Sequence, residues 1–441
     1  MPNPLSIDLL INARWIVPVI PENQIFEHCS LAVDKGNILA LVPQQEAAKR
    51  FIATETLDLG QHLLIPGLVN THCHSAMSLL RGYADDIELQ EWLEKHIWPA
   101  EMKWVGPQFV KDGTELALAE MLRSGTTCFS DMYFYPEQVA AVAQHAGARA
   151  QVNFPVLDFP SVWARGADEY INKGLALHDD YRSSELITIG FGPHAPYTVS
   201  DQPLQRISTL AEEMQAPVKS HLHETATEVE TALSSTGQRP SQRLQELGLL
   251  SPLSQCVHMT QVDDLDLEIL RESGAHVIHC PESNLNLASG FCPVDRLLNA
   301  GINVALGTDG AASNNDLDLQ GEMQTAALLA KGVAGNAAAL DAHQTLRLAT
   351  LNGARAMGLE QRIGSLEVGK AADMCAIDMD TLEATPMYNP VSLLVYTRCS
   401  HRVSHVWVNG KPLLKDRKLQ TLAEHEIITK ARSWQEKLTA Q

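Results

Sequence analysis

The sequence predicts an α/β protein, a (β/α)8 TIM barrel with a small β-sandwich domain formed by both ends of the chain. Three observations lead to this fold class. The chain of 441 residues is too long for one ordinary domain but accommodates a barrel and a smaller partner. Strand and helix patterns alternate through the middle of the chain, and short β-rich runs gather at its ends. We therefore predict a barrel over 67–371 and a β-sandwich domain built from 1–66 and 372–441.

The two ends of the chain share short β-rich runs separated by turn residues. These runs cover residues 7–20, 30–42, 56–65, 374–377 and 401–414. Asn409-Gly410 predicts a hairpin in the last run, because Asn-Gly readily takes the positive φ angles of a type I′ turn. A β-domain assembled from both ends explains this shared pattern.

Between the ends, eight strand candidates alternate with helical segments. One helix is expected over Pro107–Arg123, with Gly125 ending it. The strand candidates are Leu64–Val69, Thr126–Asp131, Arg149–Leu157, Thr188–Gly192, Pro217–His221, Gln255–His258, His276–His279 and Asn303–Gly307. Strands that alternate with helices favour parallel βα units, and eight such units favour a closed barrel over an open sheet.

Charge and composition argue against nucleic acid and membranes as partners. The chain has 33 Lys and Arg against 53 Asp and Glu, so its net charge of −20 repels nucleic acid and anionic lipid. The first apolar stretch, Ile7 to Ile20, is interrupted by charged residues and is too short to span a bilayer. The 8 cysteines are scattered singly, as is typical of reduced thiols. We therefore expect a cytoplasmic protein with a small-molecule partner.

Polar side chains occur at the carboxyl ends of the predicted barrel strands, where the βα loops of a barrel converge. His72 and His74 follow the first strand, His221 ends the fifth and Asp309 follows the eighth. Alternate residues of a strand point the same way, so His72 and His74 can reach one ion. Three imidazoles and a carboxylate suit Zn²⁺, although Fe²⁺ or Mn²⁺ would also fit. We predict one zinc ion at these four ligands, with a position left for water.

Other strand ends carry further candidates. His194 follows the fourth strand, Glu224 lies just beyond the fifth and His258 ends the sixth. A single histidine at such a place can equally be structural, and we interpret His223 and His279 in that way. The joint placement of the ligands, His194, Glu224 and His258 favours an active site.

Four motifs, in this order, resemble the amidohydrolase superfamily. They are PGLVNTHCH at 66–74, HLHE at 221–224, HCPESN at 279–284 and GTDG at 307–310. The resemblance covers essentially the whole chain, including GKAAD at 369–373, which is similar to the return into the family's β-sandwich domain. Binuclear members carry a modified lysine or a glutamate at the end of strand 4. The segment GPHAP at 192–196 has no lysine, so the resemblance implies a mononuclear metal site.

The segment at 92–101 points to one group within this superfamily. Trp92-Leu93 followed by Trp98-Pro99-Ala100-Glu101 is similar to the 5′-methylthioadenosine/S-adenosylhomocysteine deaminases. In that family the acid matching Glu101 grips ribose hydroxyls, the aromatic matching Trp92 lines the nucleoside pocket, and His194 would also contact the nucleoside. Arg165, after the third strand, is our candidate partner for the carboxylate of S-adenosylhomocysteine. It is one arginine among apolar residues, which favours the smaller methylthio group.

The resemblance implies hydrolytic deamination of the adenine ring, with ammonia and an inosine-type nucleoside as products. We assign protonation of the ring nitrogen to Glu224. Asp309 would ligate the metal and take a proton from water, and His258 would hold or polarise the attacking oxygen. The substrate expected is 5′-methylthioadenosine, with S-adenosylhomocysteine or adenosine as further candidates.

Other functions stay open at this point. A guanine, cytosine or triazine deaminase, or a chlorohydrolase, on the same scaffold would not need an acid that grips ribose. A catalytically inactive barrel serving as an interaction module would be expected to lack some metal ligands, and this sequence has all four. Barrel amidohydrolases are often homo-oligomers, so an oligomer is a further expectation.

Overall fold

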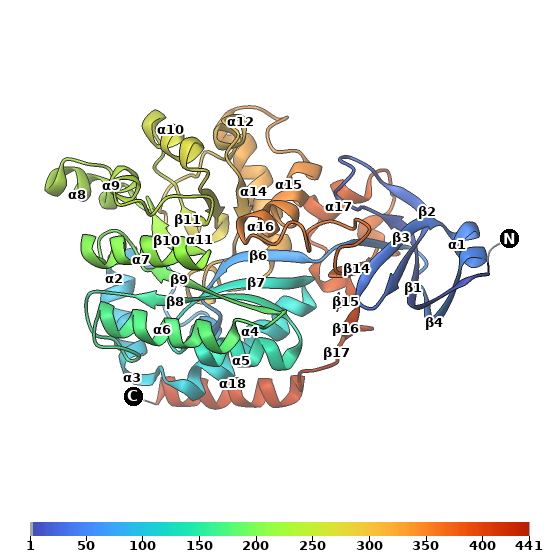
Figure 1. The fold of residues 1–441 in the computed structure, drawn as a ribbon, viewed down its shortest axis with the longest axis horizontal. Helices are drawn as coiled ribbons and strands as arrows, with labels where there is room; N and C mark the ends of the chain where they lie inside the picture. Colours follow the sequence, from blue (N-terminus) through green and yellow to red (C-terminus); the bar gives the residue numbers. More distant parts are fainter. Residues whose placement is uncertain (1–2, 441) are drawn as a thin grey trace.

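The computed structural model describes residues 3–440 as a barrel lying beside a sheet built from both ends of the chain (Figure 1). This arrangement confirms the predicted fold class. Residues 1, 2 and 441 of the ranges predicted for the β-sandwich domain lie outside the described residues. Within residues 3–440, no helix is both long and apolar enough to cross a membrane.

Eight parallel strands form the barrel, and each pairs with its neighbours in chain order from β6 to β13. They are β6 (Leu68–Cys73), β7 (Thr126–Met132), β8 (Arg149–Val156), β9 (Ile187–Pro193), β10 (Val218–Leu222), β11 (Ser254–His258), β12 (His276–His279) and β13 (Val304–Leu306). Side chains join β13 to β6: Thr71 Oγ1 donates to the Leu306 carbonyl (2.6 Å), and Asn70 Nδ2 donates to Thr308 Oγ1 (2.8 Å). The ring therefore brings the first and last strands, and the residues at their ends, together.

The expected first barrel strand, Leu64–Val69, is wrong. His62–Pro66 forms β5, which pairs with β14 of the other sheet, and the barrel strand starts only at Leu68. Gly67 separates the two strands at a crowded point, since a Cβ there would lie 2.1 Å from Thr127 Oγ1. As a result, β6 extends further than predicted and contains His72.

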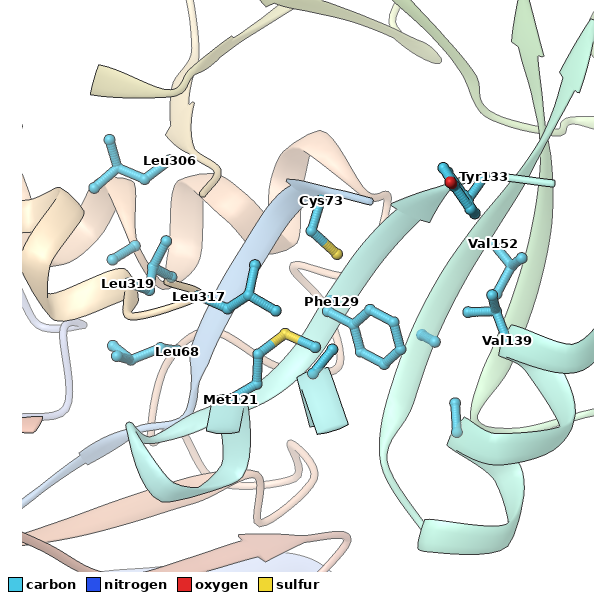
Figure 2. Packing of buried hydrophobic residues seen from close by; sticks show 14 of the residues in the cluster. Leu68, Cys73, Met121, Phe129, Tyr133, Val139, Val152, Leu306, Leu317 and Leu319 are labelled. Carbon is cyan, nitrogen blue, oxygen red and sulfur yellow. The ribbon is translucent and has the colours of Figure 1, made fainter. Parts of the chain in front are cut away.

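Helices cover the outside of the barrel and form its loops. They are α2 (Leu89–Glu91), α3 (Trp98–Trp104), α4 (Pro107–Arg123), α5 (Pro136–Ala146), α6 (Ala167–Tyr181), α7 (Asp201–Met214), α8 (Ala226–Thr236), α9 (Pro240–Glu246), α10 (Asp264–Ser273), α11 (Pro281–Asn286), α12 (Val294–Asn299), α13 (Ala311–Asn314), α14 (Leu319–Ala334), α15 (Ala342–Leu348), α16 (Leu351–Ala356) and α17 (Pro390–Tyr396). The helix α4 has the predicted bounds, with proline in its first turn and Gly125, at φ +100°, just beyond its end. Figure 2 shows the core where Met121 of α4 packs near Phe129 of β7.

The second sheet has nine strands contributed by both ends of the chain, and it lies at the right of Figure 1. They are β1 (Leu5–Ile16), β2 (Phe26–Asp34), β3 (Asn37–Pro43), β4 (Phe51–Asp58), β5, β14 (Met374–Asp378), β15 (Val403–Val408), β16 (Lys411–Lys415) and β17 (Lys418–Leu419), with the helix α1 (Gln44–Arg50) between β3 and β4. The hairpin predicted at Asn409-Gly410 joins β15 to β16, with φ angles of 47° and 69°.

The last helix, α18 (Glu424–Thr439), differs from the prediction, because it lies in the range assigned to the β-sandwich domain. It packs instead along the barrel helix α4, at the bottom of Figure 1. The rings of Phe109 and Trp434 meet edge to face with centroids 5.2 Å apart, and Trp434 Nε1 donates to Asp112 Oδ2 (3.0 Å). The chain therefore ends on the barrel.

Candidate active site

The four predicted metal ligands converge at the carboxyl ends of β6, β10 and β13. Asp309 Oδ1 lies 3.3 Å from His72 Nε2 and 3.2 Å from His74 Nε2. The Nε2 atoms of His72 and His221 are 3.3 Å apart. His72, His221 and Asp309 are buried and His74 is nearly so.

Two backbone carbonyls fix how these imidazoles present their nitrogens. His74 Nδ1 lies 2.5 Å from the Met132 carbonyl, and His221 Nδ1 lies 2.8 Å from the His194 carbonyl. A carbonyl only accepts hydrogen bonds, so both Nδ1 atoms carry hydrogen and both Nε2 lone pairs face the cluster.

Burial favours the neutral, metal-binding form of two of the predicted ligands. It lowers the pKa of His72 and of His221 well below the usual histidine value. Imidazole nitrogens and a carboxylate that converge in this way favour a cation between them. The donor set therefore fits a divalent metal ion.

His258 joins the same cluster from the end of β11. Its ligand nitrogen lies within 4.8 Å of those of His72 and His221, and its Nε2 is 3.9 Å from Glu224 Oε1. The backbone of His258 has φ +80°, a conformation that is uncommon for a residue with a side chain. Strain of this kind gathers at functional sites, where the surrounding structure enforces it.

The Asp309 carboxylate is held from several sides. Its Oδ2 accepts hydrogen bonds from Ser283 Oγ (2.7 Å) and Ser313 Oγ (3.3 Å), and its Oδ1 accepts from the Gly310 amide (2.9 Å). Its approach to the histidines depends on Gly307, where a Cβ would lie 2.8 Å from His72 Cβ and 2.9 Å from the His72 amide nitrogen. Glycine at 307 thus lets the eighth strand come close to the first.

A cavity of about 340 Å³ opens over the metal cluster. Its floor holds His74, His221, His258 and Asp309, and Glu224 lies beside them. Much of the remaining lining is apolar and includes Leu89, Leu93, Met102, Phe134, Leu157, Phe159 and Val162. A ligand in this cavity would meet the polar cluster with one part and apolar walls with another.

Three of the residues predicted to bind substrate line this cavity. Trp92 is buried in its wall, His194 lies near the cluster, and Glu101 is only 8% exposed. The Tyr133 hydroxyl donates to Glu101 Oε1 (2.6 Å), which leaves the second carboxylate oxygen for a ligand. Burial raises the pKa of Glu101 to about 7 and lowers that of His194 to about 4, so His194 is neutral at physiological pH.

Arg165 is the exception and requires a correction. Its side chain is 91% exposed and is not among the residues that line the cavity. Arg165 Nε pairs with Glu169 Oε2 (3.2 Å), one helical turn further along the chain. This local ion pair on the surface holds the guanidinium outside, and the role predicted for it has no support in this geometry.

Several residues that contact the site were not found from the sequence. Ser283 and Asn284 are the last two residues of the third motif, at 279–284, to which the sequence assigned no role, and they contact Asp309 and His258. Tyr133 lies one residue beyond β7, a barrel strand whose end carries none of the predicted site residues. Glu228 accepts hydrogen bonds from the His223 and Glu224 amides, at 2.9 Å and 2.8 Å, and so holds the turn that carries Glu224. Only the strand-end rule could have found Tyr133.

The fold and the converging ligands define a barrel hydrolase, and the chain belongs to the amidohydrolase family, whose model matches residues 63–413. A protein of Saccharophagus degradans named 5-methylthioadenosine/S-adenosylhomocysteine deaminase is 58% identical over 100% of this chain and 99% of its own length. One of the same name from Aquifex aeolicus is 41% identical over 95% of this chain and 96% of its own.

Solved structures of similar proteins also support membership of this family. An adenosine deaminase from Xanthomonas campestris with bound zinc is 47% identical, with a TM-score of 0.98, and covers 99% of this chain and 100% of its own. A triazine hydrolase with a TM-score of 0.90 is only 22% identical and supports the fold alone. Together the matches confirm the predicted enzyme class, a metal-dependent aminohydrolase.

Proposed function

We propose that this chain catalyses zinc-dependent hydrolytic deamination of 5′-methylthioadenosine, giving ammonia and the inosine-type nucleoside. One observation carries the proposal: a single cavity joins the metal-ligand cluster to the buried carboxyl group of Glu101. A base alone would need only the inner part of that cavity. The deaminase names of the relatives and the zinc of the Xanthomonas campestris structure support the same reading.

His72, His74, His221 and Asp309 would hold one Zn²⁺, although Fe²⁺ or Mn²⁺ would suit the same donors. When bound, such an ion supplies Lewis-acid activation of water at neutral pH. The protein supplies everything else, namely the position of the purine ring, the proton donor and the acceptor for the proton of water.

Glu224 is the proposed proton donor to the ring nitrogen. Burial raises the pKa of Glu224, and the neighbouring His258 opposes this effect. A carboxyl group with a raised pKa can hold a proton near neutral pH. It can pass this proton to the ring nitrogen of the purine while water attacks the ring carbon next to that nitrogen. Asp309 takes the proton of the attacking water, and His258 orients that water by a hydrogen bond.

The nucleoside would lie along the cavity with its ribose near Glu101. Tyr133 occupies one oxygen of that carboxylate, so the other is free to accept from ribose hydroxyls. Trp92 provides an apolar wall, and neutral His194 offers a hydrogen bond at the inner end. These contacts explain why a nucleoside would be preferred over a free base.

The apolar part of the cavity lining favours an uncharged 5′ substituent. Among the described residues that line the cavity there is no lysine or arginine, and Arg165 points to solvent. The amino-acid tail of S-adenosylhomocysteine would therefore bury its carboxylate without a cation, which is costly. A methylthio group instead meets apolar walls, so S-adenosylhomocysteine and adenosine should be the poorer substrates.

The test is ultraviolet-monitored deamination by zinc-loaded protein of 5′-methylthioadenosine, S-adenosylhomocysteine, adenosine, adenine, guanine and cytosine in parallel. We expect the highest kcat/KM for 5′-methylthioadenosine and little action on the free bases. Turnover of a base with no action on any nucleoside would overturn the substrate assignment in favour of a guanine or cytosine deaminase. A chlorohydrolase would instead act on a chlorinated triazine included as an additional substrate.

A further inference from the structure

Within residues 3–440, the hydrogen-bond partner of His258 Nδ1 is the side chain of Asn284. His258 Nδ1 lies 2.8 Å from Asn284 Oδ1, and the two side chains are almost completely buried, with residue exposures of 2% and 1%. The other ring nitrogen, Nε2, faces the cluster formed with His72 and His221. Any change at Asn284 therefore reaches the site through one imidazole.

Asn284 belongs to the short helix α11, whose residues contact both Asp309, the proposed proton acceptor, and His258, the residue proposed to orient the water. Ser283, its neighbour, donates to Asp309 Oδ2 (2.7 Å). The helix is anchored on both sides: the Glu282 amide donates to Glu322 Oε2 (3.1 Å) of α14, and Asn286 Nδ2 donates to the Ser313 carbonyl (2.6 Å). The amide of Asn284 is thus presented to His258 by a fixed support.

The contact decides which nitrogen of His258 carries hydrogen. The oxygen of Asn284 can only accept, so Nδ1 donates and Nε2 keeps its lone pair. A lone pair at Nε2 can accept a hydrogen bond from a water beside Glu224, whose Oε1 is 3.9 Å away. The opposite tautomer would turn an N–H toward the ligand imidazoles and could not accept that bond.

We propose that Asn284 is a positioning residue that sets the tautomer and ring orientation of His258, and thereby the hydrogen bond that orients the attacking water. The inference rests on the proposed role of His258 in deamination. Partners that orient a metal-ligating histidine in this way typically contribute about 10- to 100-fold to metal affinity or activity, and we expect an effect of the same size on kcat here.

Two substitutions separate the hydrogen bond from the packing. Asn284→Leu keeps the size of the side chain but removes the acceptor, and we expect kcat to fall about 10- to 100-fold with metal content unchanged. Asn284→Asp keeps an acceptor oxygen and should restore most of kcat. Equal loss in both variants, or loss of metal from Asn284→Leu, would overturn the proposal.

Combining each substitution with His258→Leu tests whether Asn284 acts through His258. We expect Asn284→Leu to cause no further loss of kcat in the His258→Leu background. The control is Leu285→Ala, a 42% exposed position on the same helix, which should leave kcat unchanged in both backgrounds. An additive loss from Asn284→Leu would make its role merely structural and overturn the proposal.

Nitrogen NMR of histidine-labelled protein gives a readout that does not depend on turnover. His258 should show a protonated Nδ1 in the wild type and in Asn284→Asp, and should lose this signature in Asn284→Leu. A wild-type Nε2–H tautomer would contradict the inference. If His258→Leu itself retains normal kcat, the proposed role of His258 fails; if His258→Leu is inactive and Asn284→Leu is normal, only the role of Asn284 fails.

Discussion

Glu224 lies in the cavity beside the ligand cluster, and its turn is fixed by Glu228, whose carboxylate accepts from the Glu224 amide (2.8 Å). Glu224→Gln should keep the metal, because Glu224 is not a ligand, yet lower kcat by about 100-fold or more, since an amide cannot transfer the proton. Steady-state kinetics with metal analysis of the same samples checks this. Glu230→Gln, an exposed change on α8, is the matched control and should have normal kcat.

A Glu224→Gln variant with a near-normal rate would remove Glu224 from the mechanism. Loss of metal together with activity would instead mean that the turn after β10 supports His221, and the inactivity could then not be assigned to proton transfer.

Glu101 predicts a specific dependence on pH. Burial raises its pKa to about 7, while Tyr133 and His74 act in the opposite direction. The carboxylate that accepts from ribose exists above this pKa and is lost as the pH falls through it. We expect kcat/KM for nucleosides to decrease as the pH falls below about 7, which gives the pH profile an acidic limb. The Glu101→Gln variant should lack this acidic limb and should have a raised KM. An unchanged acidic limb in Glu101→Gln would exclude Glu101 as its source.

At the residue scale, the sequence was most informative where a strand ends. His72, His221 and Asp309 could be predicted because the barrel brings strand ends to one place, whatever the loops do. The position of the Arg165 side chain could not be predicted, because a side chain in a loop can pair with any of several local partners. Here it pairs with Glu169, one helical turn away. Asn284 was hidden for a similar reason, since its contact depends on the path of a short helix after β12.

At the scale of elements, the approach of β13 to β6 decides whether the cluster forms. Gly307→Ala would place a methyl group 2.8 Å from His72 Cβ and 2.9 Å from its backbone nitrogen, and the backbone cannot yield cheaply. We expect a cost of about 1–3 kcal/mol and a weaker metal site. Urea denaturation and metal titration measure the two effects.

The control for Gly307→Ala is Gly332→Ala in α14, where a Cβ would meet nothing within 4 Å. This change should leave metal binding intact and raise stability slightly, because alanine favours a helix. Normal metal affinity in Gly307→Ala would show that the ends of β6 and β13 do not need this close contact.

Element boundaries were predictable where turn residues coincide with a change of pattern. Helix α4 matches its prediction because proline starts it and glycine ends it. The prediction of the first barrel strand was wrong because one apolar run continues across Pro66-Gly67, although β5 and β6 belong to different sheets. The helix α18 was missed as part of the barrel because its partner, α4, lies more than 300 residues away along the chain.

At the scale of the whole molecule, a metal ion bound at the proposed ligands would tie three distant strands together. Its ligands come from β6, β10 and β13, so removing it should loosen the barrel mouth but leave the extensive apolar core intact. We expect chelation to leave the far-ultraviolet circular dichroism spectrum unchanged. The free energy of unfolding should fall by about 3–4 kcal/mol, compared with protein in a free metal concentration about 100- to 1,000-fold above Kd. Complete loss of secondary structure would contradict this expectation.

The fold class could be predicted as a whole because alternating strand and helix patterns with eight strand candidates admit few architectures. The nucleoside assignment depended on one resemblance at 92–101, and a cavity that includes Trp92 and Glu101 now supports it. The oligomeric state and the cytoplasmic location remain predictions from the sequence, as does the choice of zinc.

The most direct test of the central claim is conversion of 5′-methylthioadenosine in heavy-oxygen water by metal-free protein and by the same protein reloaded with zinc. We predict ammonia and an inosine-type product carrying one oxygen from water, formed only by the reloaded sample. Conversion by the metal-free protein, or none by protein with its metal bound, would contradict deamination at this site.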